Sequence, residues 1–186
     1  MPRIPLPTPD VMTAEQRKVY DAIVKGPRGT LVGPLRAALH SPELADKWQQ
    51  MGELLRYRTS LPPNISEIAI LVTARRWLSQ VEWHMHAIAA DKAGIAADVI
   101  DEIKQQRRPA KADAKALAVY DYAVELTANG HVRQSTYDAV LKDWGALGIV
   151  ELSALIGYYS MVAMTLNAHQ IPLPDGIAPP LPEPTL

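Results

Sequence analysis

The sequence predicts a single all-α domain with an extended arm at each end. Apolar residues recur at helical spacing through the middle of the 186-residue chain, and no stretch alternates polar and apolar residues for long enough to require a strand. Capping residues, glycines and prolines divide this middle into segments of helical length. Four of the sixteen prolines lie in the first nine residues and six in the last fifteen, which favours extended ends. We therefore expect arms over residues 1–12 and 171–186 around one helical domain over 13–170.

The first helices are predicted from their start signals. A capping box, made by a threonine and the glutamine three residues later, opens a helix over residues 13–26. A serine followed by proline opens a second helix over 41–59. The same kinds of start and stop signals predict five more helices: 66–93, 96–105, 113–128, 135–144 and 148–170.

Composition excludes several classes of function. A net charge of −1 gives no attraction to nucleic acid or to an anionic membrane. The chain has no cysteine, which excludes disulfides, thiolate metal sites and a cysteine nucleophile. Residues 145–166 carry one charge and are long enough to cross a bilayer, but their glycines, hydroxyls and Glu151 favour a buried helix. The N-terminus does not resemble a signal peptide, so we expect a cytoplasmic protein.

One stripe of side chains could carry chemistry. Ser79, Glu82, Trp83 and His86 follow the i, i+3, i+4, i+7 spacing of a single helix face. Glu67 lies twelve residues before Ser79 among apolar residues, where a carboxylate needs a polar partner. A histidine beside a carboxylate can transfer protons near neutral pH, and a second carboxyl group in an apolar pocket can act as an acid. The sequence leaves open whether Glu67 or Glu82 contacts His86.

An anionic substrate would need cations, for which two arginine pairs are candidates: Arg75 and Arg76, or Arg56 and Arg58. Trp77 and Trp83 are candidates for the walls of the pocket, although buried packing or a subunit interface would also explain them. Glu82 and His86 would equally form an ordinary surface pair.

A metal site is a further alternative. Five residues could contribute ligands: Glu67, Glu82, His86, Glu151 and His169. The sequence contains neither His-x-x-x-His nor a repeated Glu-x-x-His, so we predict no metal.

The window from Glu67 to His86 resembles the carboxymuconolactone decarboxylase family, which shares its fold with alkylhydroperoxidase D. The thiol branch of that family carries a glutamate, a Cys-x-x-Cys and then a histidine, which correspond here to Glu67, Ser79, Glu82 and His86. Both cysteine positions are replaced, so the dithiol peroxidase chemistry of that branch cannot run in this chain. The branch of the decarboxylases carries Glu-aromatic-x-x-His and then a second acidic helix, which residues 82–86 and 98–103 match. The resemblance is strongest over residues 50–105.

The resemblance implies an alkylhydroperoxidase D-like helical bundle that assembles as trimers or hexamers. It implies a carboxy-lyase or isomerase that acts on a small lactone-type or unsaturated acid without a cofactor, a membrane or nucleic acid. His86 would move the proton, Glu67 or Glu82 would orient it, and Ser79 would donate a hydrogen bond in place of the first thiol. Trp77, Trp83, Arg75 and Arg76 would bind the substrate. The alternatives are a non-catalytic, ligand-binding oligomer and an antioxidant peroxidase, which the lack of cysteine disfavours.

Overall fold

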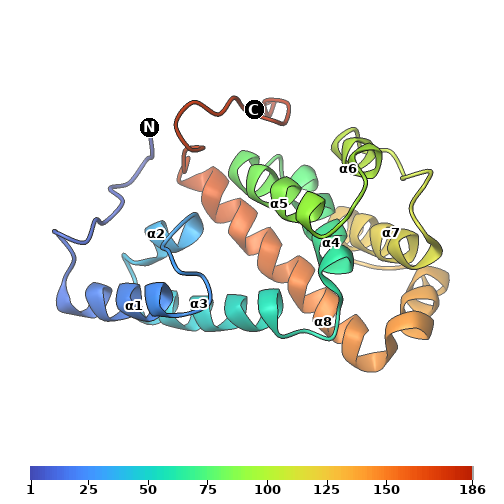
Figure 1. Cartoon of the computed structure of the whole chain (residues 1–186), viewed down its shortest axis with the longest axis horizontal. Coiled ribbons are helices and arrows are strands. Elements are labelled where there is room, and N and C mark those ends of the chain that lie inside the picture. The colour runs from blue at the N-terminus through green and yellow to red at the C-terminus, as the bar shows by residue number, and fades with distance from the viewer. Residues whose placement is uncertain (186) are drawn as a thin grey trace.

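The all-α prediction is confirmed. The computed structural model describes residues 1–185, and in that range it contains eight helices and no strand (Figure 1). Their bounds are α1 Ala14–Lys25, α2 Pro34–Ala38, α3 Pro42–Tyr57, α4 Pro63–Arg76, α5 Gln80–Lys92, α6 Ala97–Lys104, α7 Ala114–Asn129 and α8 Gln134–Ala168. The capping box of Thr13 and Gln16 is present, and Asp113 caps α7 through the amide of Ala116. Residue 186 lies outside the described range.

The long helix α8 is the central element of the bundle. It runs diagonally through the molecule in Figure 1 and contacts α2, α3, α4, α5 and α7. The sequence predicts two helices here, and α8 consists of two helical segments that meet at a kink at Gly145, whose φ of 63° belongs to the left-handed region. Glycine adopts this conformation without a steric penalty, which explains both the kink and the two-helix prediction.

By length and composition, α8 is the one helix among residues 1–185 that could cross a membrane. Half of its most apolar 18-residue window is buried inside the protein. The contacts of α8 with five other helices are those of a core helix.

The prediction of one helix over residues 66–93 is wrong, because the chain breaks into α4 and α5 at residues 77–79. Leu78 takes a left-handed conformation with a φ of 51°. Two contacts from α8 hold the break: Asn167 donates a hydrogen bond to the Trp77 carbonyl at 2.7 Å, and the Trp77 indole donates to Ser160 at 3.1 Å. The break lets α5 pack against α4, so that residues far apart on a straight helix become neighbours.

A second layer, formed by the first three helices, covers one side of α8. α1 contacts α3, while α2 contacts both α3 and α8 (Figure 1). The five-residue α2 was not predicted from the sequence, although its proline at the first helical position is a usual start signal. The loop between α1 and α2 brings Arg28 towards the interior of the protein.

Both arms are extended and lie against the helical domain. The Arg3 amide donates to the His169 carbonyl at 2.9 Å, and the His40 ring lies 2.7 Å from the Pro5 carbonyl. In the C-terminal arm, Leu181 is buried and exchanges hydrogen bonds with the Gln80 side chain. Gln80 is the first residue of α5, so the C-terminal arm is fixed to the helix that carries Glu82 and His86.

Candidate active site

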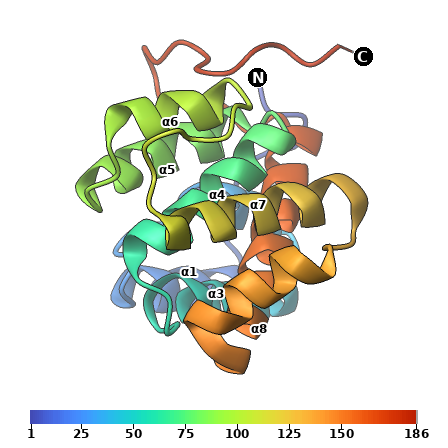
Figure 2. The ribbon, with the colours of Figure 1, turned by 90° about the vertical axis from the view of Figure 1, so that its right-hand side faces the viewer.

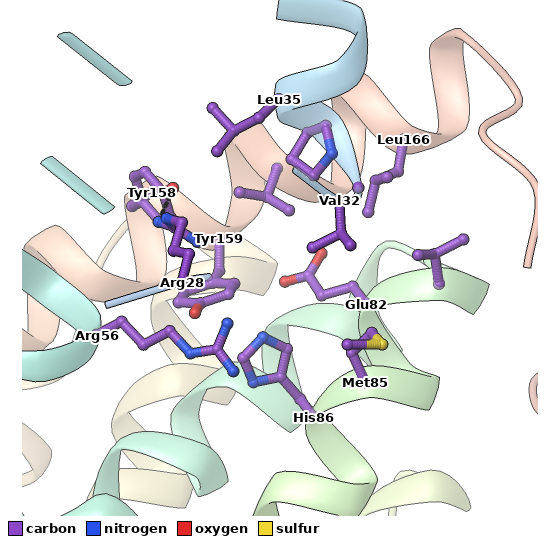
Figure 3. Close-up of a pocket in the computed structure, with 14 residues that line it drawn as sticks. Arg28, Val32, Leu35, Arg56, Glu82, Met85, His86, Tyr158, Tyr159 and Leu166 are labelled. Carbon is purple, nitrogen blue, oxygen red and sulfur yellow. Dashed lines mark hydrogen bonds between the residues drawn. The ribbon is translucent and has the colours of Figure 1, made fainter. Parts of the chain in front are cut away.

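A cavity of about 80 Å³ lies where α5 and α8 meet the layer of α2 and α3 (Figure 3). We call it the His86 cavity. Its volume is several times what one water molecule needs, so it has room for a small organic molecule. It is lined by Arg28, Val32, Gly33, Pro34, Leu35, Arg56, Val81, Glu82, Met85, His86, Tyr158, Tyr159, Val162 and Leu166.

His86 pairs with Glu67 at this cavity. The histidine Nδ1 lies 2.7 Å from the glutamate Oε2, and both side chains are buried. An ionised carboxylate only accepts hydrogen bonds, so it fixes the proton on Nδ1 and leaves Nε2 of the neutral ring as an acceptor. The Tyr159 ring packs edge-on against the imidazole, with ring centroids 4.8 Å apart, which further restricts its rotation. The sequence left open which glutamate contacts His86, and the structure shows that it is Glu67.

Glu82 is a buried carboxyl group without a hydrogen-bond partner among residues 1–185. Its residue is 2% exposed, and neither carboxyl oxygen makes a hydrogen bond. Burial raises the pKa of Glu82 well above its ordinary value of 4.5, and the nearby Ser79 hydroxyl opposes this shift only in part. Burial therefore favours the neutral form of Glu82, and a neutral carboxyl group can donate a proton.

The position of Glu82 differs from what its local pattern favours. Ser79 is the N-cap of α5 and Glu82 the third helical residue, which is the spacing of a capping box. Neither side chain caps the helix in the structure. The Glu82 carboxyl points into the cavity instead (Figure 3), where a buried acid has a cost that capping would have avoided. Such a conflict between local preference and structure is typical of functional sites.

Two arginines supply positive charge to the cavity. Arg56 extends from α3 towards the His86 ring, and Arg28 enters from the loop between α1 and α2 (Figure 3). Nη2 of Arg28 lies 3.5 Å from the Tyr158 hydroxyl, while its Nε is buried without an acceptor. Neither arginine forms an ion pair with a carboxylate in the described part of the chain. Two cations without counter-ions beside a neutral acid make the cavity attractive to a small anion.

The close approach of Arg28 and Tyr158 depends on Gly52 of α3. A Cβ atom at Gly52 would overlap the Tyr158 hydroxyl and the Arg28 guanidinium. Glycine at this position therefore makes room for the polar side of the cavity.

The opposite side of the cavity is apolar and excludes water from the polar groups. Its side chains are Val32, Leu35, Val81, Met85, Val162 and Leu166. Burial also raises the pKa of Tyr159, so its hydroxyl stays protonated. It can donate or accept a hydrogen bond, but it carries no charge. A low local dielectric strengthens every charge interaction with a bound molecule.

The structure brings together only part of the set predicted from the sequence. His86, Glu67 and Glu82 converge at one cavity, and Ser79 lies buried beside Glu82. Trp83 belongs to the core and does not line the cavity, because it follows Glu82 directly and so lies about 100° further round α5.

Three other residues that we expected to bind substrate lie elsewhere. Trp77 lines a separate hollow beneath the terminal arms, and its indole is bonded to Ser160. Arg75 and Arg76 line a cavity between α4, α6 and α7. The unpredicted break after Arg76 is the reason, since it turns the end of α4 away from the face of α5 that carries His86.

Of the five residues considered as metal ligands, Glu151 and His169 lie away from the His86 cavity. Glu151 accepts two hydrogen bonds from Ser60, and His169 ends α8. Nowhere in residues 1–185 do three histidine or acidic side chains lie close enough to hold one metal ion.

Two site residues were missed from the sequence. Arg28 follows Gly26-Pro27 in a loop, and nothing in the sequence marks it as different from any surface arginine. Tyr159 lies on the last helix, where a buried aromatic residue usually serves packing alone. The near-absence of charge in that helix already placed Tyr159 in the interior, and only its contact with His86 distinguishes it.

Comparison with known proteins finds similarity of structure only. No protein-family model and no curated protein matches the chain. Among solved structures, it resembles the alkylhydroperoxidase D core of an uncharacterised peroxidase-related protein from Ralstonia eutropha JMP134, with a TM-score of 0.78 and 14% identity over 94% of this chain and 93% of that one. It also resembles a peroxidase-related protein from Silicibacter sp. TM1040, with a TM-score of 0.75 and 16% identity over 91% and 90% of the two chains.

A third similar structure is that of a cysteine-to-alanine variant of the debrominase Bmp8 in complex with 2,3,4-tribromopyrrole. Its TM-score is 0.74, with 11% identity over 93% of this chain and 91% of that one. These identities are low, so the similarity establishes the architecture of the chain. The protein has the alkylhydroperoxidase D-like fold, as the sequence predicted, and this fold fits the family that the window from Glu67 to His86 resembles.

Proposed function

We propose that the protein is a cofactor-free acid–base enzyme that decarboxylates or isomerises a small lactone-type or unsaturated organic acid. The observation that carries this proposal is the convergence of the His86–Glu67 pair and the unpartnered Glu82 on one cavity. A base held in one tautomer and an acid held neutral by burial are the two groups that proton transfer requires.

His86 is the proposed proton acceptor and donor. Glu67 holds its Nδ1, so Nε2 remains to exchange a proton with a bound molecule, and the glutamate charge stabilises the imidazolium that results. Glu82 is the second acid. In an isomerisation, His86 removes a proton from one carbon of the substrate, and a proton is returned at another carbon.

In a decarboxylation, the bond between the substrate carbon and its carboxylate breaks, and CO₂ leaves. The electron pair stays on the carbon and is delocalised into a neighbouring carbonyl as an enolate. A proton from Glu82 or from protonated His86 then completes the product, and solvent restores the proton to the acid. The positive charges of Arg28 and Arg56 would stabilise the enolate oxygen, to which the negative charge of the departing carboxylate moves.

The two arginines also support an anionic substrate, since they lack counter-ions within residues 1–185. The apolar side of the cavity supports a compact carbon skeleton next to the charged group. The similar Bmp8 variant holds a small cyclic organic molecule, which agrees with this size class. The chain has no cysteine, so it cannot carry out thiol chemistry.

A panel of lactone acids and unsaturated acids tests the proposal, with NMR to detect loss of CO₂ or a shifted double bond. We expect at least one member to be converted by the wild type and His86→Gln to lower its turnover by about 10²-fold or more. His84→Gln is the matched control, because His84 lies on the same helix but does not line the cavity. Equal turnover in His86→Gln and His84→Gln would refute the mechanism.

We also propose that the protein acts as a cytoplasmic homo-oligomer. Leu147 and Val150 of α8 are 64% and 66% exposed in the single chain. Exposed apolar side chains on a central helix are suited to a subunit contact. Light scattering measures the mass directly, and a monomer would contradict this part of the proposal.

A further inference from the structure

A second cavity, which we call the Arg75 cavity, lies between α4, α6 and α7, which are neighbours in Figure 2. It measures about 280 Å³ and shares no lining residue with the His86 cavity. Val72, Ile103 and Val124 form apolar walls, and two arginines, Arg75 and Arg76, also line the cavity.

Arg75 is held in place but is not neutralised. Its Nε donates a hydrogen bond to the Lys104 carbonyl at the end of α6, which orients the guanidinium and leaves both Nη groups available. Burial lowers the pKa of Arg75, which means that its charge has lost part of its hydration. No carboxylate in the described part of the chain forms an ion pair with it. A cation that is partly dehydrated and has no counter-ion favours binding of an anion.

Arg76 and Tyr120 add to the same polar side. Arg76 is exposed and lines the cavity, and its guanidinium lies over the Trp77 ring, 5.3 Å from the ring centroid. Burial raises the pKa of Tyr120, so its hydroxyl remains a neutral donor. The lining of the site thus adds a second arginine and a phenol to the oriented guanidinium of Arg75.

Arginines at the end of a helix also have a simpler explanation, because α4 and α6 both end near this cavity and cations stabilise helix C-termini. That explanation accounts for the bond from Arg75 Nε to the Lys104 carbonyl. It does not account for a cavity with apolar walls, into which a second arginine also faces.

We propose that the Arg75 cavity is a second binding site, for a small organic anion that has a carboxylate or sulfonate group on an aryl or alkyl body. The anionic group would bind the guanidinium groups of Arg75 and Arg76, and the body would lie against Val72, Ile103 and Val124. This site is separate from the proposed catalysis, and nothing in it requires His86 to be active.

Calorimetric titration with 2-naphthoate tests the site, with 2-naphthamide as an uncharged probe of the same shape. We expect saturable binding of the naphthoate that the double variant Arg75→Gln/Arg76→Gln weakens at least about tenfold, since each charged hydrogen bond is worth more than one factor of ten. Arg56→Gln identifies any binding at the His86 cavity, and Arg107→Gln controls for loss of charge near, but outside, the Arg75 cavity.

Binding that is lost in the double variant and kept in Arg56→Gln and Arg107→Gln supports the proposal. Equal affinities of the wild type and the double variant, or of naphthoate and naphthamide, would overturn it. A double variant that changes the mass of the assembly while leaving the naphthoate affinity unchanged would also overturn it, and would assign the arginines to a subunit contact.

Discussion

Nδ1 of His86 lies 2.7 Å from Oε2 of Glu67, although nineteen residues separate the two in sequence. The contact exists because the chain breaks at Leu78 and α5 packs back against α4. It joins the two helices in the interior and fixes the tautomer of the imidazole.

Replacing Glu67 with alanine leaves the His86 ring nitrogen buried without a partner. We expect Glu67→Ala to lower the free energy of unfolding by about 1–3 kcal/mol, the usual cost of an orphaned buried polar group. Glu67→Gln keeps an acceptor oxygen at the same place and should cost less. Urea denaturation measures both, and an equal loss in the two variants would show that the hydrogen bond is not what stabilises this contact.

Glu82 should make the stability of the protein depend on pH in a definite direction. Its pKa is raised in the folded state, so above about pH 4.5 the unfolded chain releases a proton that the folded protein keeps. The favourable contribution of protonated Glu82 is complete below pH 4.5 and is lost as the pH rises towards the folded pKa.

The isosteric Glu82→Gln variant removes this titration. We expect its melting temperature relative to the wild type to increase as the pH rises above 4.5 towards the folded pKa of Glu82. The exposed Glu183→Gln is the control and should show no such trend. A difference between Glu82→Gln and wild type that is independent of pH would mean that Glu82 ionises normally.

Gly52 should tolerate no side chain. In an open helical position, alanine in place of glycine stabilises by up to about 1 kcal/mol. At Gly52 the new methyl group would meet Tyr158 and Arg28, so we expect Gly52→Ala to destabilise by about 1–3 kcal/mol and to weaken anion binding in the His86 cavity.

Gly157 provides the matched control for this substitution. It lies in α8, and nothing occupies the space of its Cβ within 4 Å. Thermal unfolding should show Gly157→Ala stabilised and Gly52→Ala destabilised. Stabilisation of both would contradict the close packing of Tyr158 and Arg28 against α3.

The attachment of the C-terminal arm to α5 should depend on the side chain of Gln80. Gln80 accepts from the Leu181 amide at 2.8 Å and donates to the Leu181 carbonyl at 3.0 Å, as a paired backbone segment would. We expect Gln80→Ala to speed hydrogen exchange at Leu181 and to expose the arm to carboxypeptidase. Unchanged protection of Leu181 would show that its buried side chain alone holds the arm.

Local sequence signals predicted most of the helices because caps, glycines and prolines act over a few residues. Thr13, Asp113 and Gly130 all do in the structure what their residue types favour. The break at Leu78 could not be predicted, because neither glycine nor proline marks it and Asn167 and Ser160 hold it from the other end of the chain.

The residues of the candidate site also fall into two groups: those that local sequence signals predict and those that only tertiary packing brings to the cavity. The spacing of Glu82 and His86 placed them on one face of a helix, and an isolated Glu67 among apolar residues required a polar partner. Arg28 and Tyr159 reach the cavity through tertiary packing, which no spacing reveals. Arg75 and Arg76 lie outside the His86 cavity because of the missed break, since a straight helix would have kept them beside Ser79, Glu82 and His86.

The most direct test of proton transfer in the His86 cavity is deuterium exchange into a carbon acid. An unsaturated or lactone acid that binds the protein is incubated in D₂O, and NMR follows the loss of its proton next to the carbonyl group. We expect wild type and His84→Gln to catalyse the exchange and His86→Gln to leave it at the rate without protein. Exchange that continues undiminished in His86→Gln would show that this histidine does not carry the proton.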